Sequence, residues 1–127
     1  MKTRYALTLA MLAGAALGAA AVQGLHAQAT PPAYAVIAVD VTNADAYLKE
    51  YAPLAAKAMK DGGGTFLARG GKTVGIDGEA PKRAILISFD SMEKAQAALA
   101  SSEYRQARQT GEKYAKFHIY LVEGLAK

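Results

Sequence analysis

Arg69 is the side chain of this sequence with the clearest chemical meaning. It ends a short extended stretch, Thr65–Arg69, that lies between two glycine-rich turns. A guanidinium at the end of a core strand is costly to bury without a partner, and its planar fork matches a carboxylate or an enolate. The setting therefore favours an anchor for a small organic anion. An ion pair with Asp40 or Glu123, or a contact within a dimer, would explain the same residue structurally.

His118 and four tyrosines could supply proton transfer and hydrogen bonds to such an anion. A histidine can shuttle protons near neutral pH, but a lone histidine on a strand also serves as a hydrogen-bonded surface or interface residue. The tyrosines could line a pocket, or their rings could belong to the core with only the hydroxyl in water. They are Tyr47, Tyr104, Tyr114 and Tyr120, and the candidate ligand-binding residues are Arg69, His118, Tyr47 and Tyr104.

Three other kinds of site are not supported by the sequence. Cysteine is absent and His118 is the only histidine outside the N-terminal region, so one subunit cannot assemble a zinc or iron triad. Gly71-Lys72-Thr73 resembles the end of a phosphate-binding loop, but Phe66 occupies the position of its first glycine. Ser88 has no glycine elbow around it, as a nucleophilic serine would require. We therefore predict no metal and no cofactor.

The basic residues are spread along the chain. The formal net charge is +4, and two of the 15 Lys and Arg residues, Lys2 and Arg4, lie in the N-terminal region. No run of like charge occurs in the remainder, so the sequence predicts no nucleic-acid partner.

The elements that must position these residues begin with a strand and a helix. Tyr34–Val41 is β-branched and apolar on both faces, which predicts a strand covered on both sides. Asn43 is a suitable cap for a helix that runs to the glycines at 62–64, and Pro53 should kink or restart that helix. Thr65–Arg69 is the second strand, with a bulge or bend at the glycines after Arg69, and Thr73–Ile76 is expected to continue it.

The second half of the chain repeats this order. Arg83–Phe89 predicts a third strand, and Phe117–Glu123 predicts the last strand. Helical patterns lie between them, with a cap in Asp90–Glu93, a capping box if Asp90 is the cap, and a second cap around Ser101. The order β-α-β-β-α-β is that of an α+β, ferredoxin-like fold, in which helices cover one face of an antiparallel sheet. Because the first strand is apolar on both faces, we expect a second copy to cover the other face in a homodimer.

The first 29 residues predict a signal peptide. Lys2 and Arg4 precede an apolar run, Tyr5–Val22, and Ala27-Gln28-Ala29 has the small residues of a cleavage site. Cleavage after residue 27 or 29 would release a periplasmic or secreted domain, residues 30–127, with no stable membrane association. The alternative is an uncleaved N-terminal anchor, because the run is near the minimum length for spanning a bilayer.

Short motifs along the domain resemble those of a known family. They include FLARGG at Phe66–Gly71, FDSME at Phe89–Glu93, SEY at Ser102–Tyr104 and LVEG at Leu121–Gly124. This chain is similar to the bacterial domain-of-unknown-function family 1330 from about Ala33 to Gly124. The resemblance implies a dimeric α/β-barrel fold, whose superfamily includes small oxygenases, isomerases and dehalogenases. It supplies no catalytic residues.

Three functions remain open at this point. The first is a module that binds a small anionic organic molecule between sheet and helices through Arg69. The second is a cofactor-free oxygenase or isomerase, in which Arg69 holds an enolate and His118 or a tyrosine moves the proton. The third is a purely structural dimer.

Overall fold

Four antiparallel strands form one sheet in the computed structural model, which describes residues 30–126. The central strands are β1 (Ala33–Val41) and β3 (Arg83–Phe89), and the edge strands are β2 (Thr65–Arg69) and β4 (Ala115–Glu123). The strand order is β2-β3-β1-β4. Pro31–Leu125 forms a unit of its own by its internal contacts. The predicted signal peptide lies outside the described residues.

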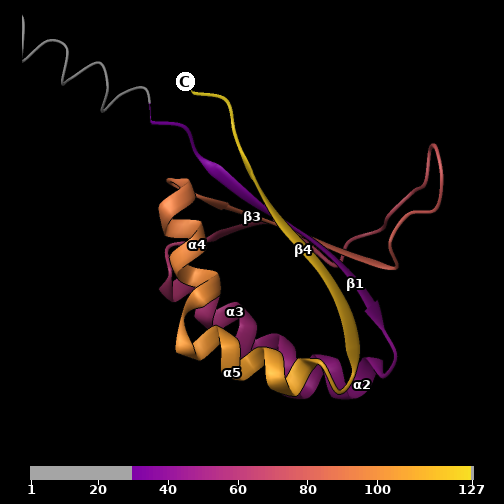
Figure 1. Cartoon of the computed structure of the whole chain (residues 1–127). Coiled ribbons are helices and arrows are strands. Elements are labelled where there is room, and N and C mark those ends of the chain that lie inside the picture. The colour runs from indigo at the N-terminus through magenta and orange to yellow at the C-terminus, as the bar shows by residue number, and fades with distance from the viewer. Residues whose placement is uncertain (1–29, 127) are drawn as a thin grey trace, which may run out of the picture. The chain divides into compact units, whose positions relative to one another are not determined.

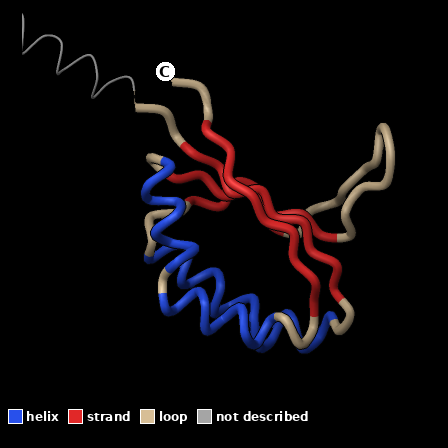
Figure 2. Tube along the Cα trace, viewed as in Figure 1, coloured by secondary structure: helices blue, strands red, loops and turns tan. Residues whose placement is uncertain are grey.

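The helices all cover the same face of this sheet (Figures 1 and 2). The first crossover consists of α2 (Ala44–Ala46), a π-helical segment η1 (Tyr47–Tyr51) and α3 (Ala52–Asp61). The second consists of α4 (Met92–Ala100) and α5 (Ser102–Gly111). The predicted β-α-β-β-α-β order and the ferredoxin-like fold are therefore confirmed. Between residues 30 and 126, no helix combines the length and the apolar character needed to cross a bilayer.

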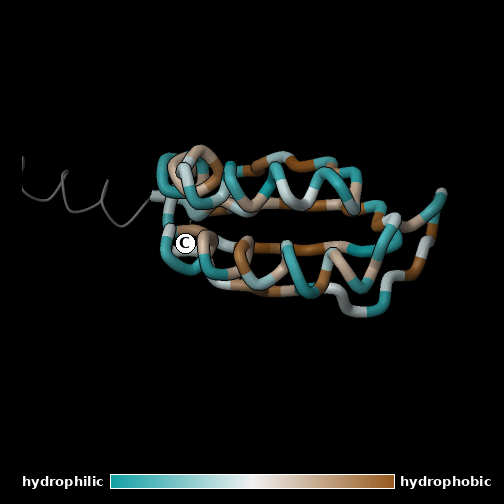
Figure 3. Tube along the Cα trace, turned by 90° about the horizontal axis from the view of Figure 1, so that it is seen from below, coloured by the Kyte–Doolittle hydropathy of each residue, from teal (hydrophilic) through white to brown (hydrophobic). Residues whose placement is uncertain are grey.

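Alternation along the strands separates a buried face from an open one. In β1 the side chains of Ala33, Ala35, Ile37 and Val39 are buried under the helices, and hydrophobic stretches run along the strands in Figure 3. The opposite face carries Val36, which pairs with Leu86 on one side and Tyr120 on the other. Tyr120 is 51% exposed and Val122 is 45% exposed. One face of the sheet thus carries exposed apolar side chains that nothing within residues 30–126 covers.

Local capping explains where the helices begin. The Asn43 side chain accepts a hydrogen bond from the Ala46 N–H at 3.2 Å, as predicted for a helix N-cap. Ser101 likewise accepts from the Tyr104 N–H at 3.2 Å. The cap of α4 is Ser91, which lies in the predicted capping stretch and accepts from the Lys94 N–H, so the capping box that required Asp90 as the cap does not form. Asp90 instead pairs with the Lys94 ammonium group.

Pro53 restarts the first helix, as its missing N–H predicts. The segment before it is a π-helix in which the Ala52 N–H donates to the Tyr47 carbonyl, five residues back. The α-helix α3 then begins with Pro53 in its first turn, where a proline costs no hydrogen bond. This wide turn buries both Tyr47 and Tyr51 under the sheet, and their ring centres are 5.1 Å apart.

The second strand differs from its prediction in two ways. Its bulge lies at Leu67, between the pairs Phe66–Ile87 and Ala68–Leu86, rather than at the glycines after Arg69. The strand ends at Arg69, so the expected continuation through Thr73–Ile76 is wrong. The segment between β2 and β3 is a loop that projects from the sheet (Figure 1). It closes on itself, because the Thr73 hydroxyl donates to the Pro81 carbonyl at 2.8 Å.

Candidate functional site

A pocket lies between the helix-covered face of the sheet and the helices η1, α3 and α5. The space inside it that is open to a water-sized molecule is about 30 Å³, so its enclosed part is small, and it adjoins a wider hollow that shares Arg69 and Arg83. The sheet contributes Ile37, Phe66, Arg69, Arg83, Ile85 and Ile87, and the helices contribute Tyr47, Tyr51, Ala52, Ala55, Ala56, Met59 and Tyr104. Two guanidinium groups and three phenol groups are therefore the polar side chains in an otherwise apolar wall.

Arg69 reaches this pocket because of the bulge at Leu67. Residues three apart on a regular strand face opposite sides, but the bulge adds one residue to β2. Phe66 pairs with Ile87 and Arg69 pairs with Ile85, so both lie on the face that the helices cover. The Arg69 guanidinium carbon lies 4.7 Å from the centre of the Phe66 ring, a cation–π contact.

Neither structural partner suggested for Arg69 pairs with it. Asp40 forms its ion pair with Lys82, at 3.4 Å. Within residues 30–126, no carboxylate lies at ion-pair distance from Arg69 or from Arg83. The described part of the chain therefore leaves both guanidinium groups without a counter-charge.

Arg83 is the residue that sequence reasoning missed. It opens β3, pairs with the buried Val39 and shares its face with Ile85 and Ile87. Its Nε is buried and has no hydrogen-bond partner in the described residues, and its guanidinium carbon lies 5.3 Å from the centre of the Tyr47 ring. The alternation in Arg83-Ala-Ile-Leu-Ile was the available signal, because it puts the arginine on the same face as Ile85 and Ile87.

Three buried tyrosines form the helical side of the pocket. Burial raises the pKa of Tyr47 above its usual value of 10.0, against a smaller opposite effect of Arg83. Burial also raises the pKa of Tyr51 strongly, and the neighbouring Tyr104 adds to the rise. Both groups therefore remain neutral phenols at neutral pH. Tyr104 is only 4% exposed, and its buried hydroxyl lies beside that of Tyr51, since a hydrogen bond with Tyr104 is among the causes of the raised Tyr51 pKa.

The close approach of α5 to the tyrosines depends on Gly111. A Cβ at this position would lie 2.5 Å from the Tyr51 ring. The ring instead packs against Phe117 of β4, with ring centres 5.1 Å apart, and the Arg108 guanidinium carbon lies 4.2 Å from the same Phe117 ring. An aromatic cluster thus supports the pocket from the side of β4.

His118 does not lie in this pocket. It pairs with Ala38 on the open face of the sheet, and its ring contacts that of Tyr120 edge-on at 5.9 Å. A separate, shallower hollow there also includes Asp40, Lys82 and Lys116. The sheet therefore separates His118 from Arg69, Tyr47 and Tyr104, which the structure brings together.

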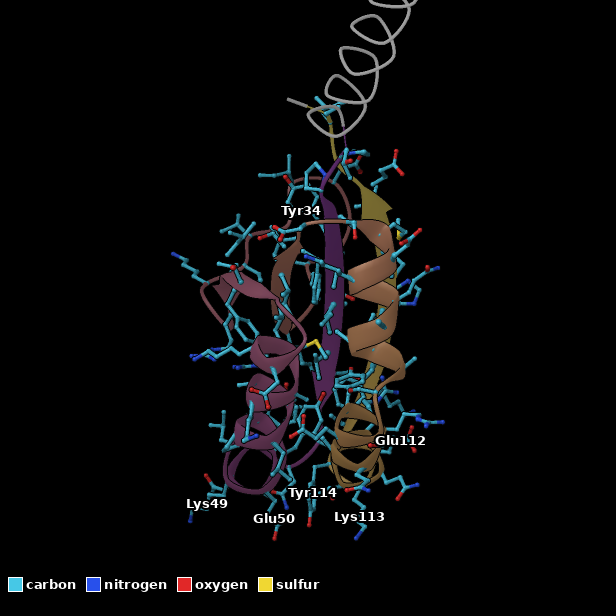
Figure 4. The ribbon with its side chains drawn as sticks, turned by 90° about the vertical axis from the view of Figure 1, so that its left-hand side faces the viewer. Tyr34, Lys49, Glu50, Glu112, Lys113 and Tyr114 are labelled. Atoms are coloured by element: carbon cyan, nitrogen blue, oxygen red, sulfur yellow. The ribbon has the colours of Figure 1, made fainter. Side chains whose placement is uncertain are left out.

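The remaining candidate tyrosines are also outside the pocket lining. Tyr114 lies at the same end of the domain as Glu50 (Figure 4), and a hydrogen bond with Glu50 is the main cause of its raised pKa. Tyr120 is on the open face with His118. No cluster of three or more His, Cys, Asp or Glu side chains occurs in the stretch from residue 30 to 126, so these residues supply no metal site of that kind.

This chain belongs to a family known as the domain of unknown function DUF1330, whose model matches residues 32–125. A search of curated proteins finds no match. The family prediction made from the short motifs is confirmed.

Solved structures with the same fold are distant in sequence. A protein of unknown function from Rhodopseudomonas palustris has a TM-score of 0.62 and 14% identity, over 76% of this chain and 85% of its own. A proposed antibiotic biosynthesis monooxygenase from Nitrosomonas europaea has a TM-score of 0.52 and 14% identity, over 73% and 90%. SnoaB, a cofactor-independent oxygenase from Streptomyces nogalater, has a TM-score of 0.52 and 14% identity, over 73% and 92%. At this identity the likeness supports the α/β-barrel fold alone.

Proposed function

We propose that this protein binds a small, largely apolar organic anion in the pocket between the sheet and the helices. One observation carries the proposal: the guanidinium groups of Arg69 and Arg83 line the same pocket without a carboxylate partner among residues 30–126. Arg69 is exposed and Arg83 is half-buried, so it is the buried Nε of Arg83 that is expensive to leave unpaired. A ligand carboxylate or enolate would supply the missing charge and accept two parallel hydrogen bonds from one guanidinium.

The rest of the pocket wall favours a ligand with an apolar body. Ile37, Ile85, Ile87 and Met59 offer no side-chain hydrogen-bonding group to a ligand. Arg69 and Arg83 also line a second, shallower hollow with Leu48 and Pro53. Both cations are therefore reachable from solvent, and a ligand could enter with its charged group directed to them.

Catalysis as an oxygenase or isomerase is the alternative function. Its support is the fold shared with a cofactor-independent oxygenase and the convergence of Arg69 with three tyrosines. His118, on the other face of the sheet, cannot act in this pocket within one chain. Because Tyr47 and Tyr51 have raised pKa values, they favour hydrogen-bond donation over proton abstraction, and binding is the better supported function.

We propose in addition that the protein is an exported homodimer. The open sheet face presents exposed apolar side chains, among them Tyr120 and Val122, that a second copy would cover. The support for export is the N-terminal sequence pattern, in which Lys2 and Arg4 precede an apolar run and a small-residue cleavage site. A purely structural dimer would share both properties but would leave the pocket without a ligand.

Ligand identification tests the binding function directly. The protein is purified from the cell envelope, and native mass spectrometry compares it with the variant Arg83→Met. The expected result is a bound organic acid in the wild type that is reduced or absent in the variant. An empty wild-type pocket, together with no response of its amide NMR spectrum to a panel of small carboxylic acids, would contradict the proposal and favour the structural dimer.

A further inference from the structure

Two buried polar atoms in the pocket have no hydrogen bond of good geometry within residues 30–126. They are Arg83 Nε and Tyr104 Oη, and both residues line the same pocket. A third such atom, Arg108 Nε, belongs to a residue outside the pocket lining. Buried polar groups in folded proteins are nearly always hydrogen-bonded. Two unpaired groups in one pocket therefore indicate two points at which a ligand is held.

These two groups differ in charge and come from opposite walls. Arg83 is a cation on the strand β3, whereas Tyr104 is on the helix α5. Tyr104 is packed beside Tyr51, whose pKa is raised by burial and further by the charge of Tyr104 and a hydrogen bond with it. The two hydroxyls use one proton between them, which leaves the other for a ligand. A ligand spanning the pocket would meet a positive charge from the sheet and a phenol hydroxyl from the helical layer.

Gly70 determines where the cation lies. Its φ is +72°, and a Cβ on it would lie 2.2 Å from Arg83 Nη1 and 2.6 Å from Arg83 Cζ. The Gly70 N–H donates to the Ala84 carbonyl at 3.0 Å, which holds this backbone against β3. The Arg83 guanidinium thus packs on bare backbone at a place that no other residue type would leave open. Gly70 is a positioning residue for Arg83.

Resting on the proposed function, we infer that the ligand is a carboxylic acid with a second, uncharged oxygen separated from the carboxylate by an apolar body. Arg83, positioned by Gly70, binds the carboxylate. Tyr104 donates a hydrogen bond to the second oxygen, which belongs to a ketone, an ether or a hydroxyl group. The isoleucine and methionine side chains of the wall contact the body between the two ends.

Matched acids that differ only in the second oxygen test this inference. The first pair is para-acetylbenzoate and para-ethylbenzoate, and the second is δ-ketohexanoate and hexanoate. Amide NMR titration of the protein gives an affinity for each acid and locates the site. One hydrogen bond changes affinity by roughly threefold to tenfold, so in the pair that fits the pocket the ketone should bind more tightly by that factor.

Amino-acid substitutions show which residues cause the preference for the ketone acid. Tyr104→Phe should bind both members of the pair with the affinity that wild type shows for the acid without the ketone, and Tyr120→Phe, on the open face, should keep the preference. Gly70→Ala should lower the affinity for both acids by roughly tenfold or more, since it displaces a charge-assisted contact between Arg83 and the carboxylate. Gly78→Ala is its control, because Gly78 also has a positive φ, +87°, but no atom near its missing Cβ.

The outcomes separate this inference from the proposed function. Acids that bind wild type with no preference for the ketone, or a preference that survives in Tyr104→Phe, would overturn the inference and leave anion binding standing. Equal effects of Gly70→Ala and Gly78→Ala would remove the positioning role of Gly70. If Gly70→Ala does not fold, Arg83→Met is used in its place, and it should lower the affinity for both acids by the same factor. Absence of binding by all four acids to wild type would count against the proposed function as well.

Discussion

The guanidinium carbon of Arg83 lies 5.3 Å from the centre of the buried Tyr47 ring. This contact joins the first residue of β3 to the π-helical segment and makes one wall of the pocket continuous from sheet to helix. The ring face offers the cation a weak electrostatic partner, but it is no substitute for a carboxylate. The consequence is a cation held beside the phenol, with its buried Nε unpaired among the described residues.

Replacing either arginine by methionine should affect binding more than stability. Methionine has a similar length and no charge, and no described carboxylate would be left without its partner. We expect Arg69→Met and Arg83→Met to change the free energy of unfolding by less than about 1 kcal/mol. Each should weaken anion binding by about 1.5 to 3 kcal/mol. Thermal melts with and without small carboxylic acids measure both quantities.

The matched control for these variants is Arg105→Met, on the exposed surface of α5. A loss of about 3 to 5 kcal/mol in Arg69→Met or Arg83→Met would reveal a buried ion pair. Such a loss, with no melting shift of wild type by any acid, would contradict the anchor role.

Leu86→Asp tests the homodimer. Leu86 pairs with Val36 on the open face of the sheet, so a second copy that covers this face would bury the new carboxylate without a partner. That burial costs several kcal/mol, and the protein should become monomeric or unfold. Analytical ultracentrifugation measures the change in mass. Ile76→Asp, in the exposed loop, is the control and should remain dimeric. A folded and dimeric Leu86→Asp protein would show that the copies meet elsewhere.

Processing of the N-terminus is the third prediction. Protein recovered from the cell envelope should begin at Gln28 or Thr30, because small residues precede both positions. Intact-mass measurement distinguishes the two. Recovery of the chain from the membrane fraction with Met1 still present would instead support an N-terminal anchor.

Most of the fold could be predicted because its signals are local. Strands β1 and β3 are apolar on both faces, and the caps Asn43 and Ser101 begin helices by short-range hydrogen bonds. Thr73–Ile76 failed as a strand for a non-local reason: its β-branched residues favour extension, but it has no partner strand once β2 has ended at Arg69. Whether such a segment forms an edge strand depends on hydrogen bonding to a neighbouring strand more than on residue propensity.

The site was only partly predictable for a related reason. Arg69 was chosen because it follows an apolar stretch. It faces the pocket because of a bulge at Leu67, which no residue type in that segment predicts. Arg83 stands at the start of a strand, where a charged residue is usually a solvated end. The space for its guanidinium depends on Gly70, which is 13 positions earlier in the chain. His118 was grouped with these residues by chemistry alone, and only the register with Ala38 assigns it to the other face.

The buried tyrosines predict a loss of stability in alkali. Tyr47 and Tyr51 have pKa values raised by burial above the usual 10.0, so above about pH 10 the unfolded chain releases these protons before the native protein does. Stability is therefore unaffected by these groups below pH 10 and falls as the pH rises from there towards their native pKa values. Each such group contributes a slope of up to about 1.4 kcal/mol per pH unit.

Tyr51→Phe isolates this effect, because phenylalanine keeps the ring against Phe117 and Gly111 but cannot ionise. Denaturant unfolding at a series of pH values should give a smaller alkaline slope for Tyr51→Phe than for wild type, by up to about 1.4 kcal/mol per pH unit. Tyr120→Phe, in which an exposed phenol is removed, should retain the wild-type slope. Equal slopes for Tyr51→Phe and wild type would mean that Tyr51 ionises as readily in the native protein as in the unfolded chain. That result would contradict the burial of the Tyr51 hydroxyl on the helical side of the pocket.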